Sequence, residues 1–267
     1  MKLEFPRILW INRDLLWRMT ERQVLGRYRG SFVGLGWSFL QPLAMLAVYT
    51  FVFSEVFHAK WGTLNSSSPI AFAINLFSGL IVFNLFSEST NSAPTSIVAN
   101  PNYVKKVIFP LEVLGASNVL AATFSSLISL AALAFAQLAT THSIPVTYLW
   151  IPIVWLPLLL LCLALSWALG AIGVFLRDTS QIVGVATSML MFLSPIFFPL
   201  SALPPHWRPL LRLNPIADII EQTRTITVAG HHPNPGWTLG SILLGVAACE
   251  LSYRGFKKAK KAFADVM

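Results

Sequence analysis

The sequence predicts an all-α integral membrane protein, and three observations support this prediction. Apolar residues make up 55% of the 267 positions and charged residues only 11%, whereas a soluble domain carries about a quarter charged residues. Long windows without Asp, Glu, Lys or Arg recur along the chain, and the first is 25 residues long, from Gly30 to Ser54. A helix of roughly 20 apolar residues crosses the hydrocarbon core of a bilayer. Finally, Lys and Arg gather at the ends of these windows.

The charge-free windows locate the membrane crossings. They cover residues 30–54, 61–87, 113–176, 179–207 and 225–249. The third is too long for one helix, and the polar stretch 140–145 divides it. The sequence therefore predicts six transmembrane helices, at about 33–56, 70–90, 113–138, 148–174, 181–199 and 236–252. The predicted organisation is a cytoplasmic segment at 1–29, a transmembrane domain at 30–252 and a basic tail at 253–267.

The distribution of positive charge predicts the orientation. Six crossings place both termini on one side, and 15 of the 19 Lys and Arg residues then lie on that side. The four on the other side are Lys60, Arg208, Arg212 and Arg224. Because cytoplasmic loops carry an excess of Lys and Arg, both termini are predicted to be cytoplasmic.

Residues 6–24 are predicted to form an amphipathic helix in the cytoplasmic membrane interface. Its apolar stripe consists of Ile8, Ile11, Leu15 and Met19. Trp10 and Trp17 are residues typical of the headgroup level. The alternative is a short solvated helix that leads into the first crossing.

The first crossing carries small residues and aromatics that suggest two roles. Gly26, Gly30 and Gly34 recur at four-residue intervals, a spacing that lets helices approach closely, either within one subunit or between two. Pro42 is expected to kink the helix. The aromatic residues of this crossing either line a path for a polysaccharide or serve as core and lipid contacts.

Two further segments are candidates for contacts outside the membrane. The loop from Asn100 to Gly115 suits docking of a soluble cytoplasmic partner, although it could also be an ordinary charged loop. At the end of the fifth crossing, four prolines (Pro195, Pro199, Pro204 and Pro205) exclude a regular continuous helix. Asn214 can then cap a helix that begins at Pro215, and Gly230 can follow its end. We expect two short helices there, re-entering the outer leaflet or lying on it.

Several kinds of chemistry lack their sequence signatures. The chain has no G-x-x-x-x-G-K-[ST] phosphate loop and no H-E-x-x-H motif. Its two cysteines, Cys162 and Cys249, lie in apolar windows. The candidate membrane carboxylates Glu55, Glu88 and Glu250 all fall near the ends of predicted crossings, which argues against ion-coupled transport. We therefore predict no catalytic residue, no metal site and no ATP hydrolysis by this chain.

Four segments, in order along the chain, resemble type-2 ABC exporter permeases that move polysaccharides. They are RYRGSFVGLGWSFLQPLAMLAVYTFVF, NPNYVKKVIFPLEVL, GVFLRDTSQIVGVATSMLMFLSPIFFPLSALP and LNPIADIIEQTR. Within that family the chain is most similar to O-antigen (lipopolysaccharide) export permeases, and capsule and teichoic-acid permeases are near relatives.

This resemblance implies a homodimer in the bacterial inner membrane, bound to two cytoplasmic nucleotide-binding ATPase subunits. The partner subunits would bind ATP and Mg, and this chain would hold no cofactor. A lipid-linked polysaccharide would pass through a channel at the homodimer interface. No nucleic acid is expected as a partner, because the positive charges sit at span ends, where they meet membrane lipid.

The resemblance also assigns roles to residues. The aromatics expected to line or gate the conduit are Trp37, Phe39, Tyr49, Phe53, Phe192, Phe197 and Phe198. The residues expected to couple to the ATPase are Asn102, Tyr103, Val104, Lys105, Lys106 and Ile108. The residues expected in a periplasmic gate are Trp207, Arg212, Asn214, Asp218 and Arg224.

The sequence is also compatible with two alternative functions. The first is an exporter of the same fold for capsule glycan, teichoic acid or a small drug. The second is a membrane-embedded glycan-modifying enzyme. The absence of an evident catalytic carboxylate or His within the crossings argues against the enzyme.

Overall fold

The structure is a computed structural model that describes residues 3–30, 32–52, 69–105, 109–200 and 214–266, together with positions 204, 206 and 211. Within these ranges the regular elements are helices. The α-helices are α1 (Phe5–Ile11), α2 (Arg13–Tyr28), α3 (Trp37–Phe51), α4 (Pro69–Ser92), α5 (Pro101–Lys105), α6 (Glu112–Thr141), α7 (Ile151–Phe175), α8 (Thr179–Phe192), α10 (Pro215–Thr227), α11 (Pro235–Ala259) and α12 (Phe263–Val266). Three short 3-10 helices are η1 (Gly34–Gly36), η3 (Val146–Trp150) and η5 (Lys260–Ala262).

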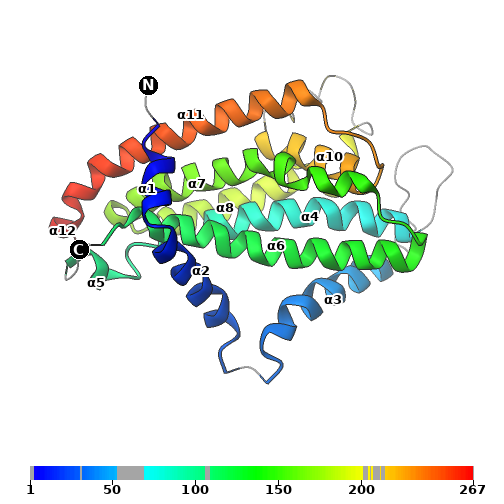
Figure 1. Cartoon of the computed structure of the whole chain (residues 1–267), viewed down its shortest axis with the longest axis horizontal. Coiled ribbons are helices and arrows are strands. Elements are labelled where there is room, and N and C mark those ends of the chain that lie inside the picture. The colour runs from blue at the N-terminus through cyan, green and yellow to red at the C-terminus, as the bar shows by residue number, and fades with distance from the viewer. Residues whose placement is uncertain are drawn as a thin grey trace.

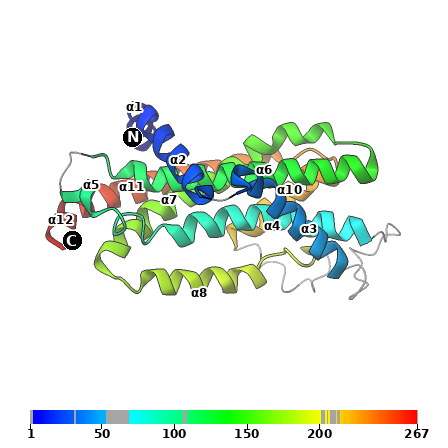
Figure 2. The same cartoon turned by 90° about the horizontal axis from the view of Figure 1, so that it is seen from below.

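Four long helices, α4, α6, α7 and α11, run along the long axis of the molecule and pack side by side (Figure 1). Helix α8 lies along one side of this bundle, against α4 and α7 (Figure 2). Helix α10 packs between α4 and α7 near one end. The observed fold class is thus all-helical over the described residues, as the sequence predicts.

Three of the described helices are long and apolar enough to cross a membrane. They cover Ile70–Ser92, Glu112–Thr141 and Val146–Phe175. These ranges agree with three of the six predicted crossings. Helices α3 and α8 have only 15 and 14 described residues, and α11 is long but more polar. The count of six crossings therefore remains a prediction.

Helices α2 and α3 leave the bundle at an angle and meet at a turn, forming a V in Figure 1. At this turn Gly30 and Gly34 have φ values of +83° and +57°, a conformation that glycine adopts without steric cost. The prediction that Gly26, Gly30 and Gly34 form one packing stripe on the first crossing is therefore wrong. The stripe pattern failed because glycine at four-residue spacing suits a turn as well as a helix contact.

The N-terminal segment forms two helices rather than one, with a break at Asn12. Ile8 and Met19 pack against a hydrophobic cluster, whereas Ile11 is 64% exposed and does not belong to the packed stripe. Trp10 and Trp17 are also exposed, at 70% and 69%. This exposure suits the predicted membrane interface, because indole rings are favoured at the headgroup level.

Two hydrophobic clusters hold the helices together. The larger joins α4, α6, α7 and α10, and it includes the buried Trp155. The indole nitrogen of Trp155 donates to Thr223 Oγ1 at 3.2 Å, so the ring also ties α7 to α10. The second cluster surrounds Trp167, whose indole nitrogen donates to the carbonyl of Glu112. It gathers α1, α7, α11 and α12 at the other end of the bundle.

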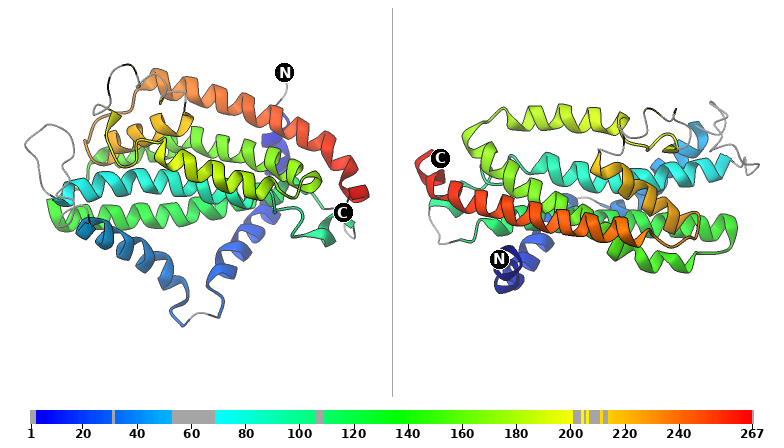
Figure 3. Two further views of the ribbon diagram at one scale, coloured as in Figure 1. Left: turned by 180° about the vertical axis from the view of Figure 1, so that it is seen from behind. Right: turned by 90° about the horizontal axis from the view of Figure 1, so that it is seen from above.

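Segments near both ends of the chain contribute to this second cluster, through Phe5 of α1 and Phe263 of α12, and Figure 3 shows both ends towards the same end of the molecule. A carboxylate oxygen of Glu250 on α11 accepts hydrogen bonds from the backbone N–H groups of Glu4 and Phe5, at 2.9 and 3.4 Å. Lys257 lies 2.8 Å from the Glu4 carboxylate. Near them, Lys260 binds the buried carboxylate of Glu112 at 3.0 Å.

Candidate functional site

The strongest polar constellation of the described chain surrounds α10, between the fifth and sixth predicted crossings. Asn214 begins the helix: its side-chain oxygen accepts the N–H of Ile216 at 3.0 Å, as an N-cap residue does. Its side-chain nitrogen donates to Ser194 Oγ at 2.9 Å. Gly230 follows the helix with φ +69°. The predicted cap, start and end of this helix are thus confirmed.

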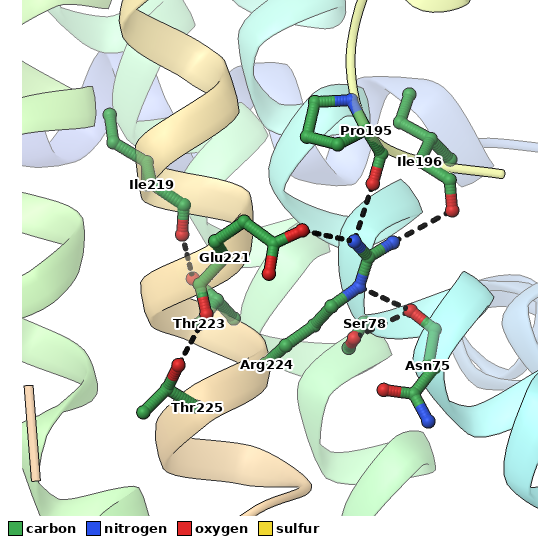
Figure 4. Close-up of polar contacts among 9 residues, drawn as sticks. All are labelled: Asn75, Ser78, Pro195, Ile196, Ile219, Glu221, Thr223, Arg224 and Thr225. Atoms are coloured by element: carbon green, nitrogen blue, oxygen red, sulfur yellow. Dashed lines mark hydrogen bonds and ion pairs between the residues drawn. The ribbon is translucent and has the colours of Figure 1, made fainter. Parts of the chain in front are cut away.

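Arg224 on α10 is the centre of the constellation (Figure 4). Its side chain is only 5% exposed. The guanidinium donates to the carbonyl oxygens of Asn75 at 3.0 Å, of Ile196 at 2.7 Å and of Pro195. It also pairs with Glu221 at 3.2 Å. One side chain therefore joins α10 to α4 and to the chain that follows α8.

Glycine makes room for this guanidinium on α4. A Cβ atom at Gly79 would lie 2.7 Å from Arg224 Nη2, which is closer than real Cβ contacts. The arginine therefore restricts position 79 to glycine. Helix formation does not explain this glycine, because glycine is unfavourable inside a helix. Burial lowers the pKa of Arg224 to about 10. The guanidinium therefore stays charged near neutral pH, and its acceptors compensate that charge.

The segment held by Arg224 and Asn214 is the predicted proline-containing break. Helix α8 ends at Phe192, before Pro195, which confirms that a regular helix does not continue through the predicted fifth crossing. Polar groups of the segment after Phe192 form hydrogen bonds with α10 and its N-cap. Asn214 donates to Ser194, and Arg224 donates to the carbonyls of residues 195 and 196. The end of α8 and α10 thus form one connected unit.

Asp218, the third predicted gate residue that the structure describes, makes a different contact. Its carboxylate accepts the indole N–H of Trp237 at 3.1 Å, which ties α10 to the start of α11. Trp207 and Arg212 lie outside the described residues. The family resemblance assigned Arg224 to the gate, and the sequence did not predict its burial. Glu221 and Gly79 were not predicted to take part.

The predicted coupling segment forms α5 at the opposite end of the bundle. Tyr103 stacks on Phe109, with ring centroids 4.4 Å apart, and its hydroxyl accepts a hydrogen bond from Arg22 at 3.0 Å. Val104 also packs against the second hydrophobic cluster. Asn102 and Lys105 are exposed on the same helix. Lys106 and Ile108 lie outside the described residues.

The described members of the predicted aromatic conduit fall into two groups. Trp37 and Phe39 are exposed on α3, while Tyr49 packs against the larger cluster. At the end of α8, Phe192 is 70% exposed and stacks on Phe197, with centroids 6.1 Å apart. Phe198 is half-buried in the same segment, and Phe53 lies outside the described residues. Both groups belong to segments that pack on α4.

Among the residues that the structure describes, no group of three or more His, Cys, Asp and Glu side chains is arranged to hold a metal ion. The polar contacts of α10 and α5 lie instead near opposite ends of the helix bundle. Comparison of the sequence with known protein families identifies the family of this chain. The ABC-2 type transporter profile matches residues 14–228, from α2 through α10. The chain belongs to the ABC-2 type transporter family.

Curated relatives of this ABC-2 type transporter match it along most of its length. The O-antigen export system permease protein RfbA of Myxococcus xanthus is 28% identical over 270 residues, covering 98% of this chain and 99% of the relative. A protein of the same name from Klebsiella pneumoniae is 23% identical, covering 95% of each. The polysialic acid transport protein KpsM of Escherichia coli is 22% identical, covering 79% and 80%.

Proposed function

We propose that this chain is the membrane permease of an ATP-driven exporter that carries a lipid-linked polysaccharide, an O-antigen, across the bacterial inner membrane. The observation that carries the proposal is similarity over nearly the whole chain to O-antigen export permeases. The family match and three candidate spans support the transport role. Capsule glycan is the second candidate cargo, because relatives include capsule and polysialic acid transport proteins.

ATP hydrolysis belongs to a separate partner in this proposal. The chain has no phosphate-binding loop of its own, so two cytoplasmic ATPase subunits would bind ATP and Mg. The exposed residues of α5, Asn102 and Lys105, would meet that partner. Tyr103 would transmit its movement, because the ring is stacked on Phe109 and bonded to Arg22 of α2.

The export path in this proposal lies at the interface of a homodimer with six crossings in each subunit and both termini in the cytoplasm. Exposed apolar and aromatic side chains on α3 and α8 are available for such an interface. Phe39 and Phe192 are examples, at 38% and 70% exposed. Helix α10 would serve as part of a periplasmic gate, since it holds the end of α8 through Arg224.

Gene deletion tests the proposal. In a host that depends on this permease, loss of the gene should remove the polysaccharide from the cell surface. Lipid-linked glycan should then accumulate inside, and expression of the wild-type chain should restore export. A deletion strain that still displays full-length surface glycan would contradict the proposal. Accumulation of glycan with altered composition on the surface would favour the enzyme alternative instead.

A further inference from the structure

A cavity of about 580 Å³ lies within one protomer, lined by the end of α2 and by α3, α4 and α6. Its volume falls within the range of roughly 300–1,000 Å³ that is typical of ligand pockets. Uncharged polar side chains form part of its lining. They are Gln41, Asn84, Ser87, Ser125, Ser126 and Ser129. Tyr49 and Phe77 contribute aromatic surface to the same cavity.

The position of Asn84 shows that lipid chains are a poor filling for this cavity. Asn84 lies inside the candidate span Ile70–Ser92, about 12 Å from the Ser92 end at 1.5 Å per residue. Its side chain is exposed. Transfer of a carboxamide from water to hydrocarbon without a hydrogen-bond partner costs several kcal/mol. Polar groups at membrane depth therefore line water-filled cavities or face polar partners.

Gln41 provides a second carboxamide across the cavity. It is exposed on α3, whereas Asn84 is exposed on α4. Two carboxamides from different helices thus line one space in a part of the chain with few charges. Each carboxamide can donate and accept hydrogen bonds. The hydroxyls of Ser125 and Ser129 donate to the carbonyls of Ala121 and Ser125, so they offer acceptors to a ligand. A sugar hydroxyl also donates and accepts, so it matches this lining.

The charged residues of the cavity cancel each other. Arg27, in the last turn of α2, forms an ion pair with Glu88 of α4 and donates to Ser125 of α6 at 3.1 Å. Both partners are about one-third exposed, at 36% and 33%. A pair of opposite charges leaves no net charge to attract an anion or a cation. The lining therefore favours a neutral ligand rich in hydroxyl groups.

We propose that this cavity is a subsite for a neutral, hydroxyl-rich stretch of the exported glycan. Asn84 and Gln41 bond the sugar hydroxyls, and Tyr49 and Phe77 contact the apolar faces of the rings. The proposal rests on the proposed export function. Tyr49 is also one of the aromatics expected to line the conduit, so the subsite adjoins that path and adds carboxamides and hydroxyls to its aromatic surface.

Thiol labelling tests the subsite directly. The native cysteines Cys162 and Cys249 are 0% exposed, so the Asn84→Cys variant introduces an accessible thiol at the cavity wall. The permease is assembled with its ATPase in proteoliposomes and treated with a water-soluble maleimide. The probe ligand is the host's surface glycan, released from its lipid by mild acid. The matched thiol control is Ser188→Cys, at an exposed position on α8 outside the cavity.

We expect the reagent to modify Asn84→Cys, and the soluble glycan to slow this reaction but not the reaction of Ser188→Cys. Adding Gln41→Ala should raise the half-protecting glycan concentration by about two- to tenfold, the effect of one neutral hydrogen bond. Asn118→Ala, which removes a carboxamide from α6 outside this cavity, should leave that concentration unchanged.

Three results would overturn the subsite. The thiol could react equally fast with and without glycan, which would show an aqueous cavity that binds none. It could resist the water-soluble reagent and react with a lipophilic one, which would show lipid. It could resist both and form disulfides between copies, which would show that a second copy fills the space. Intact export in a strain that carries the Asn84→Cys permease separates each of these failures from failure of the proposed function.

Discussion

Arg224 should be the most important single side chain for the stability of the α8–α10 unit. In Arg224→Ala the carbonyls of Pro195 and Ile196 lose their donor at buried positions, since Ile196 is 0% exposed. The carbonyl of Asn75 keeps a hydrogen bond from Ser78 Oγ at 2.8 Å. Each buried carbonyl left without a partner costs about 1–3 kcal/mol. The two together predict a loss of about 2–6 kcal/mol.

Thermal unfolding of the purified protein in detergent measures this loss. At about 2–4 °C per kcal/mol for a chain of this size, a loss near 3 kcal/mol lowers Tm by roughly 6–12 °C. Arg224→Lys should fall between alanine and wild type, because an ammonium keeps the charge but lacks the planar fork that reaches several acceptors. Hydrogen exchange should rise most at residues 193–200, where the lost contacts lie.

Arg13→Ala provides the control. Arg13 is 61% exposed and lies 3.9 Å from Asp14, and exposed ion pairs of this kind contribute about 0–1 kcal/mol. Its Tm should therefore stay close to that of the wild type. If Arg224→Ala unfolds at the wild-type temperature, the carbonyls have other donors and the anchoring role of Arg224 is refuted.

Three other substitutions test separate parts of the structure. Gly79→Ala should lower Tm in the wild type but add little in Arg224→Ala, because its methyl group would collide with the guanidinium; equal losses in both backgrounds would refute that contact. Lys105→Glu should reduce the amount of ATPase that co-purifies with the permease while membrane insertion stays normal. An unchanged amount would show that α5 is not part of the docking surface. Glu250→Ala should speed hydrogen exchange at residues 4–11, since Glu250 accepts two N–H groups at the start of α1; unchanged exchange would show that packing alone holds this segment.

The sequence predicted the long helices well, because their limits depend on local signals. Charge-free windows and turn residues placed the crossings at 70–90, 113–138 and 148–174, and the structure has α4, α6 and α7 at nearly the same positions. The cap at Asn214 was also predictable, since a capping side chain followed by proline is a local signature.

Contacts between distant segments could not be predicted in this way. Arg224 has the sequence neighbours of a surface residue, and its buried setting arises from carbonyls at positions 75, 195 and 196. The pair of Arg27 and Glu88 likewise joins two helices that are far apart along the chain. In both cases the partner belongs to another helix or loop, so periodicity within one segment carries no information about it.

The prediction for Gly26, Gly30 and Gly34 failed for another reason. These glycines fit two physical models, because glycine suits a close helix contact at four-residue spacing and also adopts a left-handed turn without steric cost. Only the backbone angles of Gly30 and Gly34 distinguish the two. The cavity beside this turn depends on the resulting angle between α2 and α3, and so it was equally hidden from the sequence.

Transport in a purified system tests the central claim most directly. The permease and its ATPase are reconstituted in proteoliposomes with the lipid-linked glycan, and a glycan-specific lectin reports which side of the membrane the sugar occupies. We predict that ATP moves the glycan away from the side that carries the ATPase, and that no movement occurs without the permease or with a non-hydrolysable ATP analogue. ATP hydrolysis without any change in glycan position would contradict polysaccharide export.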